Sequence, residues 1–258
     1  MRLTGLELRR IAMPLRTPFR TSFGSQDARD ILLVRAEGSA SGADVSGWGE
    51  CVALSDPRYS PEYVDGAEYV IEHFFAPLLI GTSVTADEVA ARLAVFEGHP
   101  MAKAAVEMAI LDAELRATDT SLASHLGAVH DRVPAGVSVG ITDTTDELLA
   151  TVEGYLADGY RRIKLKIEPG LDIERVAAVR ERFGADLALQ VDANAAYTLD
   201  DADHLAELDR YDLLLIEQPL AADDLRHHAL LAKKLRTPMC LDESITSGMG
   251  YAVHAPAA

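Results

Sequence analysis

A carboxylate recurs every 25 residues near the end of this 258-residue chain, at Asp192, Glu217 and Asp242. Each of the three closes a short apolar run, and the runs are separated by segments in which apolar side chains have helical spacing. This alternation predicts parallel strands joined by helices, with one acid at the C-terminal tip of each of three successive strands. In an α/β barrel these tips form the active-site face.

Three acids that lie together at one face repel one another unless a cation is bound between them. The spacing therefore predicts an enzyme with a divalent metal, bound by Asp192, Glu217 and Asp242. Mg²⁺ is the expected ion, because it prefers oxygen ligands. For each acid taken alone, a helix cap or a salt bridge is the simpler interpretation, and only the equal spacing of all three favours the metal.

The first half of the chain lacks this alternation. Apolar residues alternate as in antiparallel strands over 3–15 and 30–38, with a polar stretch between them, and helical spacing follows from about residue 60. A small meander followed by helices predicts an α+β module. We therefore expect one domain over 1–130 and a partial barrel domain over 131–258.

The second half predicts an α/β barrel that is truncated after its fifth strand. Strands and helices alternate from about residue 133, and no glycine-rich phosphate loop follows the first strand, which argues against a nucleotide-binding sheet. An eight-stranded barrel would need three more strand–helix units after these. The expected strands are 133–141, 161–167, 187–194, 213–219 and 237–244.

The charge and the apolar runs exclude several classes of partner. A net charge of −17 with a pI near 4.8 argues against nucleic acid and anionic membranes. The N-terminus lacks the apolar region of a signal peptide, and no run approaches the roughly 20 apolar residues of a membrane helix. A soluble cytoplasmic protein is the expectation.

Two lysines share one face of the second expected barrel strand, because side chains alternate along a strand. Lys164 and Lys166 face the barrel interior, whereas Ile163, Leu165 and Ile167 face the helices. Two solvated lysines are the alternative for an isolated pair. Beside three acids at the same end of the sheet, a partly desolvated lysine is suited to act as a general base, and we interpret Lys166 in this way.

The metal and the base together predict a reaction. Mg²⁺ with three carboxylate ligands has about three positions left for water or substrate oxygens. A substrate carboxylate bound there would be stabilised as negative charge develops on it, when the neighbouring carbon loses its proton to Lys166. Asn194, two residues after Asp192 on the same face, is suited to a hydrogen bond with the substrate.

At these positions the segments KLKIEPG, QVDANAAYTL, LLLIEQPL and TPMCLDESI resemble the enolase superfamily, in its muconate-lactonizing-enzyme subgroup. Within it the chain resembles the o-succinylbenzoate synthase / N-acylamino acid racemase group. The segments MPLRTPFRTSFG, GWGECVA, MAKAAVEMAILDAELRA and GVSVGI extend this resemblance through the first half, so that it covers residue 1 to about 247.

The resemblance implies an N-terminal capping domain and a barrel of the (β/α)₇β type. It implies that Asp192, Glu217 and Asp242 bind Mg²⁺, with Mn²⁺ or another divalent ion as an alternative. Lys166 matches the catalytic acid/base of the group, and Lys164 matches a supporting lysine. Enolase-type sites combine such a base with Mg²⁺.

Three further side chains match substrate-binding positions of the group. Residues 17–26 match a mobile loop that closes over the substrate, with Phe19 and Phe23 as apolar contacts. Ser138 matches a position near the substrate on the first barrel strand. Packing within the loop or the core is the alternative for each of the three.

The implied function is that of a carbon–oxygen lyase, an o-succinylbenzoate synthase. It would dehydrate 2-succinyl-6-hydroxy-2,4-cyclohexadiene-1-carboxylate, a step of menaquinone biosynthesis. An N-acylamino acid racemase such as an N-succinylamino acid racemase, an isomerase with the same residues, is the alternative. The expected partner is in both cases a small-molecule carboxylate, and a homo-oligomer is an alternative to a monomer. A dipeptide epimerase or a muconate cycloisomerase matches the first-half segments less well.

Enzymes of the group carry another lysine on the sixth strand, on the opposite face of the substrate from Lys166, and the sequence ends before that strand. Racemisation needs a base on each face, whereas syn elimination of water can use one lysine. We therefore expect this polypeptide alone to be unstable or inactive, and an inactive truncated fragment is the third interpretation of the sequence.

Overall fold

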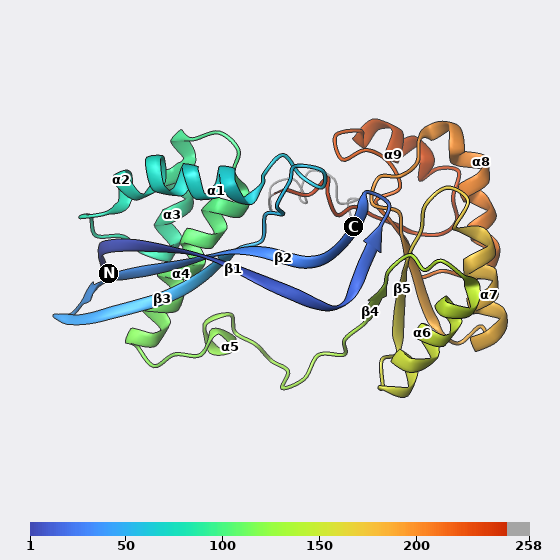
Figure 1. Ribbon diagram of the computed structural model, residues 1–258, viewed down its shortest axis with the longest axis horizontal. Coiled ribbons are helices and arrows are strands. Elements are labelled where there is room, and N and C mark those ends of the chain that lie inside the picture. Colours follow the sequence, from blue (N-terminus) through green and yellow to red (C-terminus); the bar gives the residue numbers. More distant parts are fainter. Residues whose placement is uncertain (247–258) are drawn as a thin grey trace. The chain divides into compact units, whose positions relative to one another are not determined.

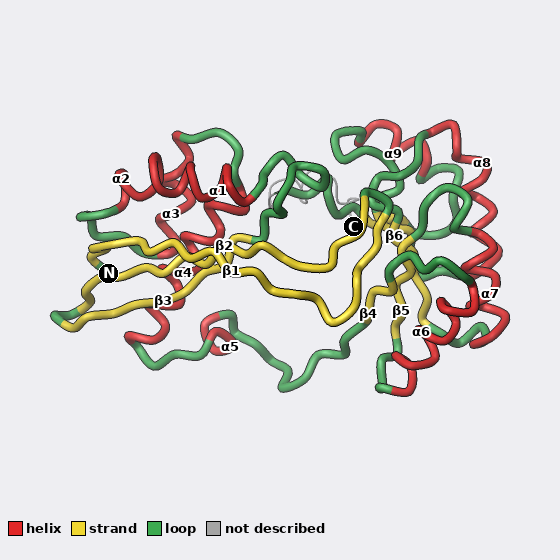
Figure 2. Tube along the Cα trace, in the orientation of Figure 1, coloured by secondary structure: helices red, strands yellow, loops and turns green. Residues whose placement is uncertain are grey.

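The computed structural model describes residues 1–246, and the chain divides into two compact units. The first contains Met1–Arg16 and Asp27–Asp131, and the second contains Thr17–Gln26 and the chain from Arg132. Figures 1 and 2 show the elements of both units, coloured by sequence and by secondary structure. Each unit has its own hydrophobic core.

The first unit is built on a three-stranded sheet in the order β1 (Arg2–Thr21), β2 (Gly24–Ala40), β3 (Ala43–Cys51). β2 and β3 pair antiparallel, from Leu32 opposite Cys51 to Ala40 opposite Ala43. The expectation that a polar stretch at 16–30 separates the first two strands is wrong. Hydrogen bonds between backbones do not require apolar side chains, so β1 and β2 continue through it to a turn at 22–23.

Helices follow the sheet in this unit, as the spacing of apolar residues predicts. The expected helix near 60–81 consists of α1, η1 and α2 in succession, with one π-helical turn in the middle. Among residues 1–246, no helix is long and apolar enough to cross a lipid bilayer. The elements are α1 (Val64–Val70), η1 (Ile71–Phe75), α2 (Ala76–Leu79), α3 (Ala86–Arg92), η2 (Leu93–Val95), α4 (Pro100–Ala117) and α5 (Leu122–His125).

Two glycines of β3 allow the long helix α4 to pack directly on the sheet. A Cβ added to Gly47 would lie 2.1 Å from the backbone nitrogen of Ala113, and one added to Gly49 would lie 2.0 Å from the carbonyl oxygen of Ala105. Only glycine fits at such a close approach of two backbones. Trp48 lies between them, and its backbone N–H donates to the Asp112 carboxylate of α4 at 2.8 Å.

The second unit is built on a parallel sheet whose described part has five strands in sequential order. Figure 1 shows α6, α7 and α8 along one side of this sheet. The strands are shorter than the apolar runs from which they were predicted. Only the residues whose backbones pair with a neighbouring strand count as part of a strand. The strands are β4 (Val137–Val139), β5 (Arg162–Lys166), β6 (Ala188–Asp192), β7 (Ile216–Glu217) and β8 (Met239–Cys240). The helical elements are α6 (Thr145–Ala157), α7 (Ile173–Phe183), η3 (Leu199–Asp201), α8 (Ala202–Leu205), η4 (Ala206–Tyr211) and α9 (Leu225–Leu231).

The two faces of β5 differ as the sequence predicts. Ile163 and Leu165 are buried in the core of this unit, whereas Lys164 and Lys166 on the opposite face are partly exposed. The aliphatic residues on one face of β5 therefore pack in the core of this unit. The two lysine side chains lie on the opposite face.

Candidate active site

Parallel register brings side chains from four strands into one row across the sheet. Lys166 of β5 pairs with Asp192 of β6, Asp192 pairs with Glu217 of β7, and Glu217 pairs with Cys240 of β8. Neighbouring residues in register point to the same face of a sheet. The row therefore collects the predicted base and two of the three predicted metal ligands.

A second row lies two residues closer to the N-terminal ends of the strands. Lys164 pairs there with Ser138 of β4 on one side and with Gln190 of β6 on the other. Ser138 is partly exposed and faces the same side as the lysines. Its predicted contact with a substrate stays a prediction.

Both lysines form ion pairs with the acids of the first row. Lys166 Nζ lies 2.5 Å from Oδ2 of Asp192, while Lys164 Nζ lies 3.0 Å from the same oxygen and 2.8 Å from Oε1 of Glu217. Asp192 is fully buried and Glu217 is 8% exposed. Buried carboxylates need compensating charge, and the two ammonium groups supply it.

The pKa values of Asp192 and Glu217 are shifted in opposite directions. Burial raises the pKa of Asp192, but Lys166 and Lys164 outweigh burial and lower this pKa overall. Burial and the adjacent Asp192 carboxylate raise the pKa of Glu217, although Lys164 lowers it. Burial lowers the pKa of Lys164, but its hydrogen bonds to Glu217 and Asp192 outweigh burial and raise this pKa overall. Two acids that affect each other in this way favour a cation between them.

Asp242 lies outside the first row. The partner of Glu217 on β8 is Cys240, so Asp242 follows two residues later, or about 7 Å along an extended chain. Among residues 1–246, no three His, Cys, Asp or Glu side chains are clustered so that they could hold a metal ion. Asp192 and Glu217 both contact the Lys164 ammonium, and their carboxylates are oxygen donors of the kind that Mg²⁺ prefers, so these two residues fit this ion. Asp242 as the third ligand stays a prediction.

Gln218 connects the loop that carries Asp242 to the end of β7, and the sequence analysis did not select it. Its side chain is fully buried, and its backbone is left-handed with φ of 38°. Oε1 accepts from the backbone N–H groups of Asp242 at 2.9 Å and Ser244 at 3.3 Å, while Nε2 donates to the Ser244 hydroxyl and the Leu220 carbonyl. A polar residue directly after the apolar run LLLIE was the available signal.

Asn194 is the centre of a second hydrogen-bonded group. Its Oδ1 accepts from Lys166 Nζ at 2.7 Å, its Nδ2 donates to Oε1 of Glu243 at 2.9 Å, and its backbone N–H donates to Asp192 at 3.0 Å. The sequence analysis predicted Asn194 but not Glu243, whose signal was only its place directly after Asp242. Burial raises the pKa of Glu243.

The tip of the β1–β2 hairpin at 17–26 belongs to the same unit as the barrel strands. The Arg20 guanidinium forms ion pairs with Asp143 at 3.2 Å and with Glu168 at 3.0 Å, and the Ser22 hydroxyl donates to the Asn194 carbonyl at 3.3 Å. These partners lie in the loops after β4, β5 and β6. Arg20 was not selected from the sequence, because nothing local distinguishes it from other surface arginines.

The tip also contacts the end of the first barrel strand. The Ile141 N–H donates to the Arg20 carbonyl at 2.9 Å, and a Cβ on Gly140 would lie 3.5 Å from the ring of Phe19. Phe19 and Phe23 are both half-buried. Their predicted contacts with a substrate stay predictions.

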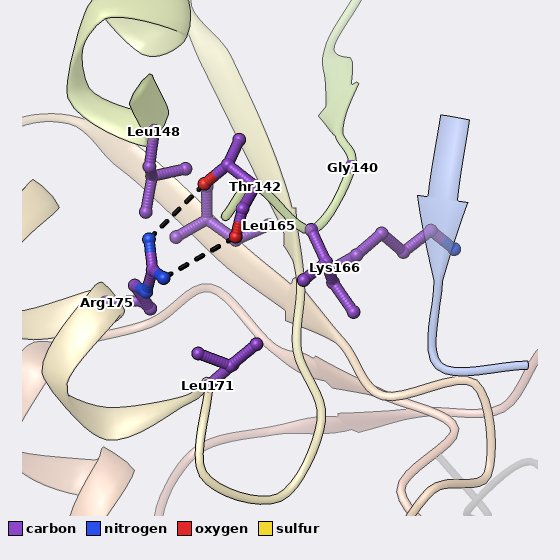
Figure 3. A pocket seen from close by; sticks show the side chains of 8 residues that line it. Gly140, Thr142, Leu148, Leu165, Lys166, Leu171 and Arg175 are labelled. Carbon is purple, nitrogen blue, oxygen red and sulfur yellow. Dashed lines mark hydrogen bonds between the residues drawn. The ribbon is translucent and has the colours of Figure 1, made fainter. Parts of the chain in front are cut away.

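A small pocket lies below the loop after β4, and Figure 3 shows its lining side chains. The Lys166 side chain extends away from Leu148 and Arg175, and Arg175 donates to the Thr142 hydroxyl at 3.3 Å. The amino group of Lys166 therefore points out of this pocket. The other residues that line the pocket are mainly aliphatic. The lining residues are Gly140, Ile141, Thr142, Leu148, Leu165, Lys166, Leu171 and Arg175.

Two family profiles match this sequence. Residues 4–127 match "Mandelate racemase / muconate lactonizing enzyme, N-terminal domain", and residues 147–255 match "Enolase C-terminal domain-like".

Racemases and synthases are both among the similar proteins. An N-succinylamino acid racemase of Amycolatopsis sp is 59% identical over 98% of this chain, and an o-succinylbenzoate synthase of Geobacillus kaustophilus is 45% identical over 93% of it. The solved structure of an enolase-superfamily member from Listeria innocua matches 97% of the chain with a TM-score of 0.90 at 37% identity. The chain spans 68%, 63% and 67% of the lengths of these three proteins.

Proposed function

The chain belongs to the mandelate racemase / muconate lactonizing enzyme group of the enolase superfamily, and from this we propose that it removes the proton next to the carboxylate of an N-succinylamino acid, as a racemase does. The row of Lys166, Asp192 and Glu217 supports this proposal. It combines a base with acids that fit a metal at the C-terminal ends of parallel strands, where active sites of α/β barrels lie.

Lys166 is the proposed base. Its Nζ contacts Asp192 and Asn194, two acceptors that fix the direction of its N–H bonds. A positioned amine of this kind can take a proton from a carbon held within hydrogen-bond reach. Lys164, whose pKa is raised by its hydrogen bonds although burial lowers it, stays protonated and supplies positive charge beside the acids.

In this proposal Asp192, Glu217 and Asp242 would hold Mg²⁺, which would stabilise the negative charge that develops on the carboxylate of the substrate. Asn194 and the tip at 17–26 have supporting roles. The tip is tied to the loops after β4 and β5 by Arg20 and to Asn194 by Ser22, so Phe19 and Phe23 are kept on the side of the barrel unit. Exclusion of water strengthens electrostatic interactions at such a site.

The comparisons reverse the order in which the sequence ranks the two activities. The sequence favours the synthase, but the racemase of Amycolatopsis sp is 59% identical and the synthase of Geobacillus kaustophilus 45%. The racemase is therefore our first proposal. Its complete reaction needs a base on each face of the substrate carbon, and Lys164 and Lys166 share one face of β5. Lys166 alone can perform the first half, which is exchange of the α-proton.

o-Succinylbenzoate synthase activity is the second candidate, and the same face of β5 supports it. Syn elimination of water can use one lysine first as base and then as acid. This reaction therefore needs only one catalytic lysine, whereas racemisation needs a base on each face. The synthases of Geobacillus kaustophilus and Bacillus subtilis, at 45% and 42% identity, are the relatives that favour it.

Parallel assays test the two candidates. The purified chain with Mg²⁺ is given N-succinyl-L-leucine in D₂O, with exchange of the α-proton followed by NMR, and separately the cyclohexadiene carboxylate, followed by absorbance of the aromatic product. We expect α-proton exchange to be the faster reaction and both reactions to stop in Lys166→Ala. Lys233→Ala, which changes an exposed lysine on the segment after α9, is the matched control and should keep wild-type rates. Turnover that persists in Lys166→Ala would contradict the proposal. Reaction of neither compound would also contradict it, in favour of the inactive fragment that is the third interpretation of the sequence.

A further inference from the structure

Glu243 has an unusual environment for a carboxylate. It follows Asp242 in the loop after β8 and is half-buried, and its Oε1 accepts one hydrogen bond, from Asn194 Nδ2 at 2.9 Å. Within the described part of the chain, its other oxygen, Oε2, is buried and accepts no hydrogen bond. A half-buried carboxylate that has one side-chain partner besides its own backbone N–H, and one buried oxygen without a hydrogen bond, costs free energy rather than supplying it. Packing stability therefore does not explain why a glutamate is present here.

The contact with Asn194 offers another explanation. The two ends of an asparagine amide are similar in shape but opposite in hydrogen bonding, because one is an acceptor and the other a double donor. Asn194 presents its oxygen to Lys166 at 2.7 Å and its nitrogen to Glu243. An ionised carboxylate can only accept, so Glu243 in this form selects this orientation of the amide over the flipped one.

The orientation of the amide determines what the lysine can do. A neutral lysine amine has two N–H bonds and one lone pair, and it must present the lone pair to act as a base. Asp192 and the oxygen of Asn194 are both acceptors, so they occupy the two N–H bonds of Lys166 and leave the lone pair free. A flipped Asn194 would instead donate an N–H to the lone pair and compete with the substrate proton.

We propose that Glu243 is a positioning residue, which acts through Asn194 to keep the lone pair of Lys166 directed at the substrate. The proposal rests on the proposed role of Lys166 as the base. The proposal predicts that replacing Glu243 lowers the activity without lowering the stability. Replacing Glu243 by leucine should lower kcat for α-proton exchange about 10–100-fold, as is typical when a partner behind a ligand or base is lost, with KM changed much less.

Stability should respond in the opposite way. Glu243→Leu removes a poorly partnered buried carboxylate, so the midpoint of thermal unfolding should stay the same or rise. Glu243→Gln keeps an acceptor oxygen for Asn194 and should lose less than tenfold in kcat. Glu181→Leu, on the exposed surface of α7, is the matched control and should leave both quantities unchanged. A residue that only supports the loop would give the reverse pattern, a lower midpoint in Glu243→Leu with no rescue by glutamine.

An exchange of the two side-chain types tests the contact without any enzyme assay. Asn194→Asp alone places two carboxylates 2.9 Å apart and should lower the thermal midpoint. Adding Glu243→Gln restores a donor and an acceptor at this contact and should recover most of the loss. Additive shifts of the midpoint would contradict the proposal, because independent sites add. If the wild-type chain shows no α-proton exchange, the proposed function fails, whereas this coupling still decides whether Glu243 orients Asn194.

Discussion

At the residue scale, Gly49 and Gly154 show two different uses of glycine. A Cβ on Gly49 would lie 2.0 Å from a backbone oxygen of α4, while a Cβ on Gly154, within α6, meets nothing within 4 Å. We expect Gly49→Ala to lower the free energy of unfolding by about 3 kcal/mol or more, because neither backbone can move freely. Gly154→Ala should raise it by about 0.5–1 kcal/mol, since alanine favours a helix interior. Chemical denaturation of both variants measures the difference, and two small changes of equal size would contradict this account of α4 packing.

His228 is a single residue that should make stability depend on pH. It is 3% exposed, its Nε2 accepts from the Leu220 N–H at 3.2 Å, and its Nδ1 donates to the Asp224 carbonyl at 2.9 Å, which requires the neutral ring. Burial lowers the pKa of His228, although Asp224 raises it in part. The unfolded chain with a histidine pKa near 6.5 then binds more protons than the folded one, so stability should fall as the pH drops below about 6.5.

The comparison of wild type with His228→Gln between pH 7.5 and pH 5 isolates this contribution. Glutamine does not titrate, so the difference in the urea midpoint between the two proteins should shrink toward low pH. Parallel midpoints across this range would show that His228 is not the residue responsible.

At the element scale, the hairpin tip at 17–26 should depend on Arg20. Its ion pairs with Asp143 and Glu168 are partly exposed, so their loss should change global stability by less than about 1 kcal/mol. The local effect should be larger. We expect Arg20→Ala to speed amide hydrogen exchange in the tip and at Ile141, whose N–H donates to the Arg20 carbonyl. Arg16→Ala, an exposed arginine of β1, is the control, and equal exchange in the two variants would argue against the ion pairs as the anchor.

The elements also show what the sequence could predict. The face of β5 that carries Lys164 and Lys166 follows from alternation alone, and the structure confirms it. The equal spacing of the three acids suggested equal depth along the sheet. However, equal spacing in the sequence does not fix which residues of two neighbouring strands are paired, because the connections between the strands differ in length. The partner of Glu217 is Cys240, and Asp242 therefore lies beyond the row.

Gln218 and Glu243 had only weak local signals in the sequence, for a related reason. Their importance lies in hydrogen bonds to residues 24 or more positions away, namely Asp242, Ser244 and Asn194. Periodicity reports which face a side chain occupies, but not which distant partner it meets. Residues 17–26 were expected only as a mobile loop, and their strand pairing was missed because backbone pairing leaves no apolar pattern.

At the scale of the whole molecule, Mg²⁺ should stabilise the folded chain. An ion that binds the folded state alone adds about 2.7 kcal/mol at a concentration of 100 times its dissociation constant. We expect Mg²⁺ to raise the thermal midpoint of wild type but not of Glu217→Gln, which lacks one carboxylate of the row. Glu207→Gln, on the exposed surface of η4, is the control and should respond as wild type does. An equal response of Glu217→Gln would remove Glu217 from the ligand set.

The fold class was predictable from the sequence. Alternation with period two in the first half and strand–helix repeats in the second are global patterns, and the antiparallel sheet and the parallel sheet follow from them. The choice between the two activities was not predictable, because Lys166, Asp192 and Glu217 are proposed to serve both. Whole-chain similarity, and not any single residue, now favours the racemase.

Deuterium exchange at the substrate α-carbon distinguishes Lys166 from any other candidate for the base. The wild-type chain and Lys166→Ala are incubated with Mg²⁺ and N-succinyl-L-leucine and with its D-enantiomer in D₂O, and the α-proton is followed by NMR. We predict that wild type exchanges the α-proton of at least one enantiomer and that this exchange is lost in Lys166→Ala. Exchange by Lys166→Ala at the wild-type rate would contradict the account, since another group would then be the base.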